Sequence, residues 1–268
     1  MDASSKLYLD LMKRCLTNWI YGPQELAPAA AGRGERLLAA LLARKGLRLM
    51  RPARFDPEQR ALGLDWPATA HTMIGMKRLD NLQFCVEDTL ARGVPGDFIE
   101  TGVWRGGSVI FMRAILKALG VTDRRVWVAD SFEGLPPPDP DKYPADRGDP
   151  HHLIDVLRVS LEQVKANFES YGLLDEQVVF LRGWFKDTLP GAPIRQLAVM
   201  RLDGDMYEST IDAFNALYPK LSAGGYVIVD DYCIPSCRKA VEDFRQRHGI
   251  ADPIQDIDGT GVYWRRTA

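Results

Sequence analysis

The sequence predicts an α/β fold built on a doubly wound, mainly parallel sheet. From about residue 71 onward, short apolar runs alternate with segments whose apolar residues recur at helical spacing. Most of these runs end in an acid, and the first of them enters a glycine-rich turn at residues 102–107. Strands that alternate with helices form parallel sheets, and such sheets bind ligands outside the carboxyl ends of their strands.

The composition sets the outer limits of the interpretation. With 268 residues, 46% hydrophobic and 26% charged, the chain resembles an ordinary soluble globular protein. A net charge of −2 argues against nucleic acid as its main partner. Four scattered cysteines indicate a reducing, cytoplasmic environment without a disulfide framework or a zinc site. We find no signal peptide and no apolar run of about 18 residues, and therefore expect no membrane segment.

The N-terminal region reads as helical. Apolar residues at helical spacing predict a helix over residues 5–20, which Gly22 and Pro23 end. Residues 33–54 carry seven basic residues against the single acid Glu35, arranged around four leucines. Such a helix can lie on an anionic membrane or bind acidic ligands, or it can pack on the core or on a second subunit; we favour packing. We expect residues 1–68 to form a helical extension with lid or oligomer contacts, and residues 69–268 to form the main domain.

Residues 55–67, punctuated by proline and glycine, predict a loop, and residues 71–90 predict a helix. Thr72 and Met73 precede that helix and could curl over a ligand bound at the next turn, although methionines are more often core filler.

The strand–turn–helix unit at residues 98–119 is the centre of the predicted site. An apolar run ends at Glu100, Gly102 and Gly106 permit a sharp turn, and the free N–H groups of the following helix can meet an anionic group. A dinucleotide-binding turn has a glycine where this chain has Trp104. The pattern Glu-x-Gly-x-x-x-Gly-Gly instead resembles the first motif of S-adenosylmethionine-dependent methyltransferases. A tight strand–helix connection without a ligand is the alternative.

The next strand, residues 126–130, ends at Asp130 and is followed by Ser131. An acid at this strand tip can accept hydrogen bonds from both ribose hydroxyls of a nucleoside, or it can cap the next turn. Residues 134–155 are rich in proline and acids and include His151 and His152, so they predict a lid or binding loop. A helix at residues 156–170 and a strand at residues 178–181 follow. The aromatic pair Trp184–Phe185 then stacks on an adenine or packs into the core.

Two further strands carry the densest group of acids. Residues 197–202 end at Asp203 and Asp205, a helix spans residues 207–218, and residues 226–229 end at Asp230 and Asp231. Carboxylates crowded at one sheet edge repel one another unless a cation lies between them. Ligands that are all oxygen suit Mg²⁺, or else Ca²⁺ or Mn²⁺; single strand-end acids also cap turns. Residues 253–257 and 261–264 predict an antiparallel pair at the sheet edge.

Five motifs together resemble the macrocin O-methyltransferase family. They are Glu-Thr-Gly-Val-Trp-Arg-Gly-Gly, Val-Ala-Asp-Ser-Phe-Glu-Gly, Gly-Trp-Phe-Lys-Asp-Thr-Leu-Pro, Leu-Asp-Gly-Asp-Met-Tyr and Asp-Asp-Tyr. The resemblance implies a Rossmann-like fold of the class I methyltransferases, S-adenosylmethionine and Mg²⁺ as cofactors, and a homodimer or higher homo-oligomer. It also implies a glycosylated natural product as substrate, with methylation of a deoxysugar hydroxyl on an antibiotic of the macrolide or aminocoumarin type.

The resemblance also assigns site residues. Asp203, Asp230 and Asp231 would hold the metal, and Asp205 is the alternative to Asp203 as a ligand. The proposed base of the family is the strand-end aspartate, here Asp203, whereas a lid histidine, His151 or His152, is better matched to neutral pH. The residues expected at the cofactor are Thr72, Met73, Glu100, Thr101, Gly102, Arg105, Gly107, Ser108, Asp130, Ser131, Gly183, Trp184, Phe185 and Asp203.

Two other functions are weighed against this one. A catechol-type metal-dependent O-methyltransferase would carry a lysine base three residues after the strand-end aspartate, where this chain has Met206. A non-catalytic module that binds S-adenosylmethionine would not require an intact acid cluster.

Overall fold

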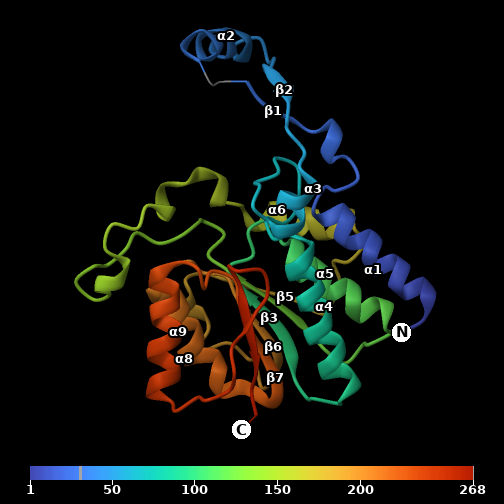
Figure 1. The fold of residues 1–268 in the computed structure, drawn as a ribbon, viewed down its shortest axis with the longest axis vertical. Coiled ribbons are helices and arrows are strands. Elements are labelled where there is room, and N and C mark those ends of the chain that lie inside the picture. Colours follow the sequence, from blue (N-terminus) through green and yellow to red (C-terminus); the bar gives the residue numbers. More distant parts are fainter. Residues whose placement is uncertain (30–31, 268) are drawn as a thin grey trace.

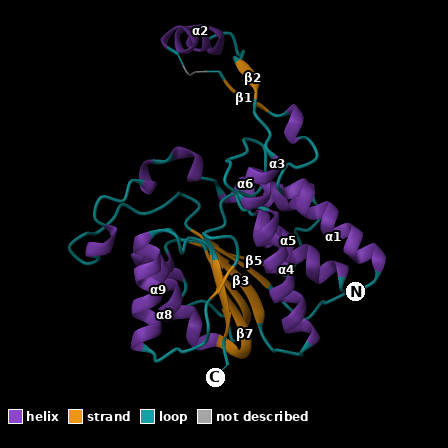
Figure 2. Cartoon of the chain, in the orientation of Figure 1, coloured by secondary structure: helices purple, strands orange, loops and turns teal. Residues whose placement is uncertain are grey.

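The computed structural model describes residues 1–29 and 32–267 and contains a seven-stranded sheet (Figures 1 and 2). The strand order is β5-β4-β3-β6-β7-β9-β8. The first five of these strands pair in parallel, and β9 pairs antiparallel with β7 and β8. The strands span Asp97–Thr101 (β3), Val126–Asp130 (β4), Val178–Arg182 (β5), Leu197–Leu202 (β6), Leu221–Val229 (β7), Gln255–Asp256 (β8) and Val262–Arg265 (β9).

Helices cover both faces of the sheet, so the predicted doubly wound α/β fold is confirmed (Figure 1). One face carries α1 (Ala3–Leu16), α4 (Met76–Ala91), α5 (Gly107–Ala118) and α6 (Leu161–Ser170). The other face carries α8 (Tyr207–Leu217) and α9 (Pro235–Arg247). Central strands β3 and β6 are buried almost throughout because each has neighbours on both edges and helices on both faces. This burial explains the largely apolar sequence of β6, whereas β3 buries Glu100 and Thr101 beside its apolar pair Phe98 and Ile99.

Several short elements differ from the prediction. The expected loop at residues 55–67 contains the helix α3 (Pro57–Leu62), which Asp56 caps and Gly63 ends in a left-handed conformation. The expected helix at residues 156–170 begins only at Leu161, because the Ser160 side chain accepts the Gln163 N–H and caps it there. A one-turn helix, α7 (Phe185–Thr188), follows β5.

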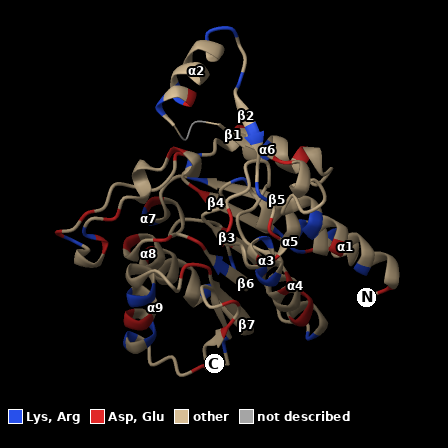
Figure 3. Cartoon of the chain, turned by 45° about the horizontal axis from the view of Figure 1, so that its top comes forward, with Lys and Arg blue, Asp and Glu red and all other residues tan. Residues whose placement is uncertain are grey.

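The basic segment does not pack on the core, and that part of our expectation is wrong. Strands β1 (Leu26–Pro28) and β2 (Met50–Pro52) form an antiparallel ribbon that carries α2 (Arg33–Ala43) away from the sheet (Figure 1). We call these three elements the arm. Helix α2 has no buried residue among those described. Figure 3 marks Lys and Arg positions of the arm in blue.

A buried ion pair holds the base of the arm. Arg60 donates to Glu25 at 3.2 Å, to Asp65 at 2.6 Å and to the Thr17 carbonyl at 2.7 Å. Glu25 also accepts the backbone N–H of Thr69. Because both charged groups of the Arg60–Glu25 pair are nearly inaccessible, each depends on these contacts.

Within the described part of the chain, no helix is both long and apolar enough to cross a membrane. Helix α1 packs against α4 and α5 rather than standing apart. The division into units 1–68 and 69–268 stays a prediction.

Candidate active site

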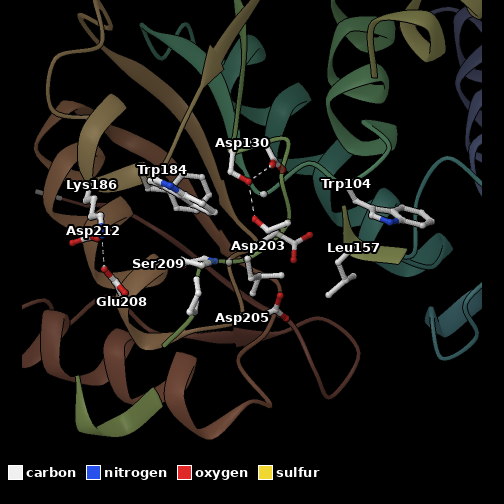
Figure 4. A pocket seen from close by; sticks show the side chains of 18 of the residues that line it. Trp104, Asp130, Leu157, Trp184, Lys186, Asp203, Asp205, Glu208, Ser209 and Asp212 are labelled. Carbon is white, nitrogen blue, oxygen red and sulfur yellow. Dashed lines mark hydrogen bonds and ion pairs between the residues drawn. The ribbon is translucent and has the colours of Figure 1, made fainter. Parts of the chain in front are cut away.

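A cavity of about 380 Å³ lies at the carboxyl ends of the strands (Figure 4). This volume falls within the range of small-molecule sites, about 300–1,000 Å³. Residues after β3, β4, β5 and β6, the first turn of α8 and the proline-rich loop all contribute to it. The lining consists of Met73, Gly102, Trp104, Asp130, Ser131, Gly134, Leu135, Pro136, Pro137, Asp139, Lys142, Leu157, Trp184, Phe185, Lys186, Asp203, Gly204, Asp205, Glu208, Ser209 and Asp212.

The backbone is strained at three of the strand ends that meet here. Trp104, Phe132 and Asp205 all have positive φ, at 47°, 59° and 56°, and they follow β3, β4 and β6 respectively. L-residues adopt this conformation at a cost of about 1–2 kcal/mol each. Such strain clusters at functional sites, where the surrounding structure enforces it.

Gly102 lets the ends of β3 and β6 approach closely. Its φ is +83°, and a Cβ at this position would lie 1.7 Å from the carbonyl oxygen of Asp203. Only glycine fits between these two strands.

Asp130 lines the cavity from the end of β4. Its carboxylate oxygens accept the backbone N–H groups of Val103 at 2.8 Å and Phe132 at 2.7 Å, so it also caps the turns as the alternative interpretation supposed. Burial raises the pKa of Asp130, and these N–H groups oppose the shift. Because each carboxylate oxygen has a second lone pair, capping leaves acceptor positions for a ligand.

Three carboxylates converge behind the cavity. Asp203, Asp230 and Asp231 each offer an oxygen, and the three oxygens lie within 4.8 Å of one another. They come from the ends of the neighbouring strands β6 and β7, which places them at one sheet edge. Oxygen donors at this spacing suit a hard divalent cation.

Two arginines that the sequence analysis did not single out lie beneath these acids. Arg201, 1% exposed, contacts Glu100 and Asp230 and donates to Asp203 at 2.7 Å. Arg78 contacts Asp230 from α4 and donates to Asp258 at 2.8 Å. Arg201 belongs to an apolar strand run, and Arg78 to an amphipathic helix, so only the three-dimensional structure brings both to the acids.

Negative charge still exceeds positive charge in this cluster. Its six carboxyl groups outnumber the guanidinium groups of Arg78 and Arg201 by four; they belong to Glu100, Asp203, Asp205, Asp230, Asp231 and Asp258. Burial, reinforced by neighbouring acids, raises the pKa of Asp205 to about 7 and that of Asp231 well above its usual range. Without a cation, protonation near neutral pH therefore removes part of this excess negative charge, and a bound cation would take the place of those protons.

Seven of the residues expected at the cofactor line the cavity: Met73, Gly102, Asp130, Ser131, Trp184, Phe185 and Asp203. The other seven lie outside that lining: Thr72, Glu100, Thr101, Arg105, Gly107, Ser108 and Gly183.

Three of these outlying residues, Glu100, Arg105 and Gly107, contact other parts of the chain. Glu100 is 1% exposed and contacts Arg201, and burial raises its pKa to about 8. Arg105 donates to the carbonyls of Ala68 and Ala70 at 2.8 and 2.7 Å and stacks on Trp104. Gly107 lies at the first turn of α5 against His71, where a Cβ would lie 2.5 Å from the His71 carbonyl oxygen.

The lid histidines lie outside the cavity lining. His151 contacts Asp149 through Nδ1 at 2.8 Å, and its backbone N–H donates to the same carboxylate. The positive form of His151 is close enough to Asp205 to oppose the rise in that acid's pKa. His152 has a buried Nδ1 without a hydrogen-bond partner among the described residues.

The sequence analysis did not predict the charged residues at the far end of the cavity. There, Lys186 lies beside Glu208 at 3.4 Å, and Asp212 from α8 completes the group (Figure 4). Burial raises the pKa of Asp212 to about 6. Glu208, Ser209 and Asp212 are at helical spacing in the first turns of α8, which gives no signal of its own in the sequence.

Known proteins of similar sequence identify the family to which the chain belongs. The family model of the macrocin O-methyltransferases (TylF) matches residues 5–266. The chain is 59% identical to 8-demethyl-8-(2,3-dimethoxy-alpha-L-rhamnosyl)-tetracenomycin-C 4'-O-methyltransferase of Streptomyces olivaceus, with 98% of this chain and 93% of that protein aligned. It is 53% identical to mycinamicin III 3''-O-methyltransferase of Micromonospora griseorubida, with 98% and 97% aligned.

Solved structures agree with the sequence comparison. The structure of the O-methyltransferase NovP superimposes with a TM-score of 0.86 at 51% identity, covering 98% of this chain and all of NovP. The calicheamicin methyltransferase CalS11 superimposes with a TM-score of 0.58 at 20% identity, covering 88% and 94%, and this match shows the shared fold. The protein is an enzyme with a class I methyltransferase fold, and the chain belongs to the macrocin O-methyltransferase family.

Proposed function

We propose that the protein is an S-adenosylmethionine- and Mg²⁺-dependent O-methyltransferase that acts on a deoxysugar hydroxyl of a glycosylated natural product. The observation that carries the proposal is the juxtaposition of a nucleoside-sized cavity with a cluster of unneutralised carboxylates at its inner edge. Relatives that match nearly the whole chain are named for methylation of tetracenomycin, mycinamicin and novobiocin precursors, and the first of these names specifies a rhamnosyl group.

The residues at the cavity fit S-adenosylmethionine. Asp130 retains acceptor capacity for a ribose hydroxyl, and Trp184 offers an aromatic surface in the same cavity (Figure 4). Phe185 also lines the cavity. Gly102 keeps the floor of the cavity free of side-chain atoms. The cofactor supplies an electrophilic methyl group on sulfur, and the role of the chain is to hold an acceptor oxygen in line with it.

The acid cluster fits Mg²⁺. Asp203, Asp230 and Asp231 would hold the ion, and its charge would lower the pKa of a sugar hydroxyl beside it. Arg201 and Arg78 fix the positions of Asp203 and Asp230 and leave the cluster negative.

Methyl transfer also needs a base that accepts the proton of the sugar hydroxyl. Asp203 belongs to the triad of close oxygens and already accepts from Arg201, which favours a ligand role over a base role. Asp205 lines the cavity, lies outside that triad and has a pKa of about 7. A base works best when its pKa is near the working pH. We therefore propose Asp205 as the base that accepts the proton, with Asp203, His151 and His152 as the competing candidates.

The alternative of a catechol-type enzyme is disfavoured by Met206, a fully buried methionine where that class places a lysine base. The test is methyl transfer measured by mass on a panel of glycosylated macrolides, aminocoumarins and catechols. We expect a mass gain of one methyl group on a deoxysugar, complete loss of turnover with EDTA, and recovery with Mg²⁺. Methylation of catechols alone, or full turnover in metal-free buffer, would contradict the proposal.

Binding is measured separately from turnover. Asp130→Ala should weaken S-adenosylmethionine binding by about 1.5–3 kcal/mol in calorimetry, the value of charge-assisted hydrogen bonds. If the wild-type chain binds no S-adenosylmethionine, the family assignment holds but this chain is not an active member.

A further inference from the structure

The lid, residues 134–155, forms one wall of the cavity. Leu135, Pro136, Pro137, Asp139 and Lys142 line the cavity from it. Figure 1 shows this segment extending over the α8 and α9 side of the sheet. A ligand of the size of the cavity therefore touches the lid, and the position of the lid decides whether the cavity is closed.

One buried carboxylate attaches the lid to the rest of the protein. Asp146 is 1% exposed and is the one buried residue between positions 134 and 155, all of which the structure describes. Its two oxygens accept the backbone N–H groups of Tyr207 at 2.7 Å and Glu208 at 2.9 Å. These are the first two residues of α8.

This contact completes a helix that cannot cap itself. The first N–H groups of any helix lack partners within the helix, and a side chain at the N-cap position usually accepts them. The N-cap residue of α8 is Met206, which makes no such hydrogen bond. Asp146 supplies the missing acceptors from about 60 positions earlier in the chain, and its negative charge also suits the positive end of the helix dipole.

The position of α8 links this contact to the acids. Helix α8 begins directly after the segment from Asp203 to Met206, and Asp205 in that segment has positive φ. Glu208, whose N–H bonds to Asp146, itself lines the cavity. The lid and the acid-bearing turn are thus attached to the same helical turn.

The chain beyond the lid is held by a weaker contact. The indole N–H of Trp104 donates to the carbonyl of Val156 at 2.7 Å, and this bond is exposed. A side chain to backbone bond at the surface exchanges readily with water. The ring of Tyr143 in the lid also contacts that of Tyr207, with centroids 5.8 Å apart. Of the two hydrogen-bonded attachments, the buried one at Asp146 is shielded from water and is the one that opposes opening.

We infer that Asp146 is a positioning residue that keeps the lid closed by capping α8, and that the lid opens when this cap is released. Ligand exchange then requires Tyr207 and Glu208 to lose their acceptors. This inference names a residue outside the cavity lining, and the part of it that concerns ligand affinity rests on the proposed function.

Trypsin tests lid closure without any ligand. The lid contains two exposed cleavage positions, Lys142 and Arg147, on either side of Asp146. In Asp146→Ala we expect cleavage after these residues to become at least about 10-fold faster than in the wild type. The matched control is Asp141→Ala, which removes an exposed acid of the same lid and should change nothing.

The pattern of fragments separates lid opening from loss of the fold. Opening of the lid yields fragments that end at Lys142 or Arg147, whereas a destabilised chain is cut throughout. Wild-type cleavage rates in Asp146→Ala, or equal acceleration in Asp141→Ala, would overturn the inference. If Asp146→Ala does not fold, Asp146→Asn, which keeps one acceptor oxygen, should show the same pattern with a smaller acceleration.

Kinetics give the second readout. In Asp146→Ala we expect KM for S-adenosylmethionine to rise about 10-fold, equivalent to about 1.4 kcal/mol, with kcat within about threefold of the wild type. A fall in kcat with unchanged KM would assign Asp146 to the chemistry rather than to closure. If the wild type neither binds nor uses S-adenosylmethionine, the proposed function fails, and the proteolysis result still decides the inference about the lid.

Discussion

Arg201 is a single buried residue that contacts three of the acids at the carboxyl edge of the sheet. Its guanidinium is fully buried and contacts acids from β3, β6 and β7, namely Glu100, Asp203 and Asp230. Surrounding acids raise the pKa of Arg201 against the effect of burial, so it stays charged. Without it, the buried carboxyl groups of Glu100 and Asp230 and the partly exposed one of Asp203 would lose the cation that lies between them.

Replacing Arg201 should therefore destabilise the folded protein strongly. Removal of one partner from a buried ion pair costs about 3–5 kcal/mol, because the remaining charges stay buried. We expect Arg201→Met to lower the free energy of unfolding by this amount in urea denaturation. The control is Arg113→Met, which removes a similarly buried guanidinium whose partner Asp175 is 27% exposed. Solvation of Asp175 should limit that loss to about 1 kcal/mol; equal losses would argue that Arg201 has no special role.

The roles of Asp203 and Asp205 can be separated by conservative substitution. Asparagine keeps the shape and one oxygen but removes the charge. We expect Asp205→Asn to lower kcat by about 10²- to 10⁴-fold, the usual contribution of a general base, while Mg²⁺ affinity changes little. Asp203→Asn should mainly weaken Mg²⁺ binding in calorimetry.

The pH profile provides an independent check. Asp205 accepts a proton only when ionised. Its pKa is about 7 before a cation is bound, and Mg²⁺ beside it would lower that pKa, so activity should fall as pH drops through a region below 7. Asp205→Asn should lose that limb of the profile. His151→Ala and His152→Ala are the controls: if either abolishes the rate while both asparagine variants retain it, a histidine is the base. If Asp205→Asn alone abolishes Mg²⁺ binding, Asp205 rather than Asp203 is the metal ligand beside Asp230 and Asp231.

At the scale of elements, the turn after β3 depends on one glycine. The close approach between Gly102 and the Asp203 carbonyl joins the ends of β3 and β6, which carry the glycine-rich turn and the acids. Any side chain here forces these two strand ends apart.

Two glycine-to-alanine variants isolate this steric effect. Gly102 and Gly120 both have positive φ, at +83° and +67°, but a Cβ at Gly120 would meet no atom within 4 Å. Gly120→Ala should cost about 1–2 kcal/mol of stability, the conformational penalty alone. Gly102→Ala should cost more and should abolish S-adenosylmethionine binding in calorimetry. Similar losses in both variants would mean that the strand ends can move apart freely.

The elements also show what the sequence could and could not predict. The core strands and the acids at their ends follow from apolar runs and glycine positions, which are local signals. The ion pairs of Arg201 and Arg78 join residues from different strands and helices, with no fixed spacing between them. The cap from Asp146 to α8 is also non-local, and its acid is hidden among the other acids of the lid. Helix α3 had a local signal, Asp-Pro at its start, that we did not use.

At the scale of the whole molecule, the arm is the part that the fold of one chain leaves unexplained. Leu37, Leu38 and Leu41 on α2 are 70%, 47% and 59% exposed, and basic residues surround them. Contiguous apolar surface of this kind marks an interaction site. Of the interpretations of the segment, packing on the chain's own core is wrong. Packing on a second subunit, contact with an anionic membrane and binding of acidic ligands remain.

We expect the arm to contact a second copy of the chain. Burying a leucine side chain instead of leaving it in water contributes about 1.5–3 kcal/mol of favourable free energy, and three leucines would be buried. Light scattering should then give a mass of at least twice 30.1 kDa. Leu37→Glu with Leu41→Glu should shift the protein toward the monomer without lowering the stability of the sheet. Ala39→Glu with Ala43→Glu has the same four-residue spacing, adds the same charge on the opposite side of α2 and should leave the mass unchanged. A monomeric wild type that sediments with anionic vesicles would instead favour the surface interpretation, since it would show that the leucines and the basic residues meet lipid rather than another subunit.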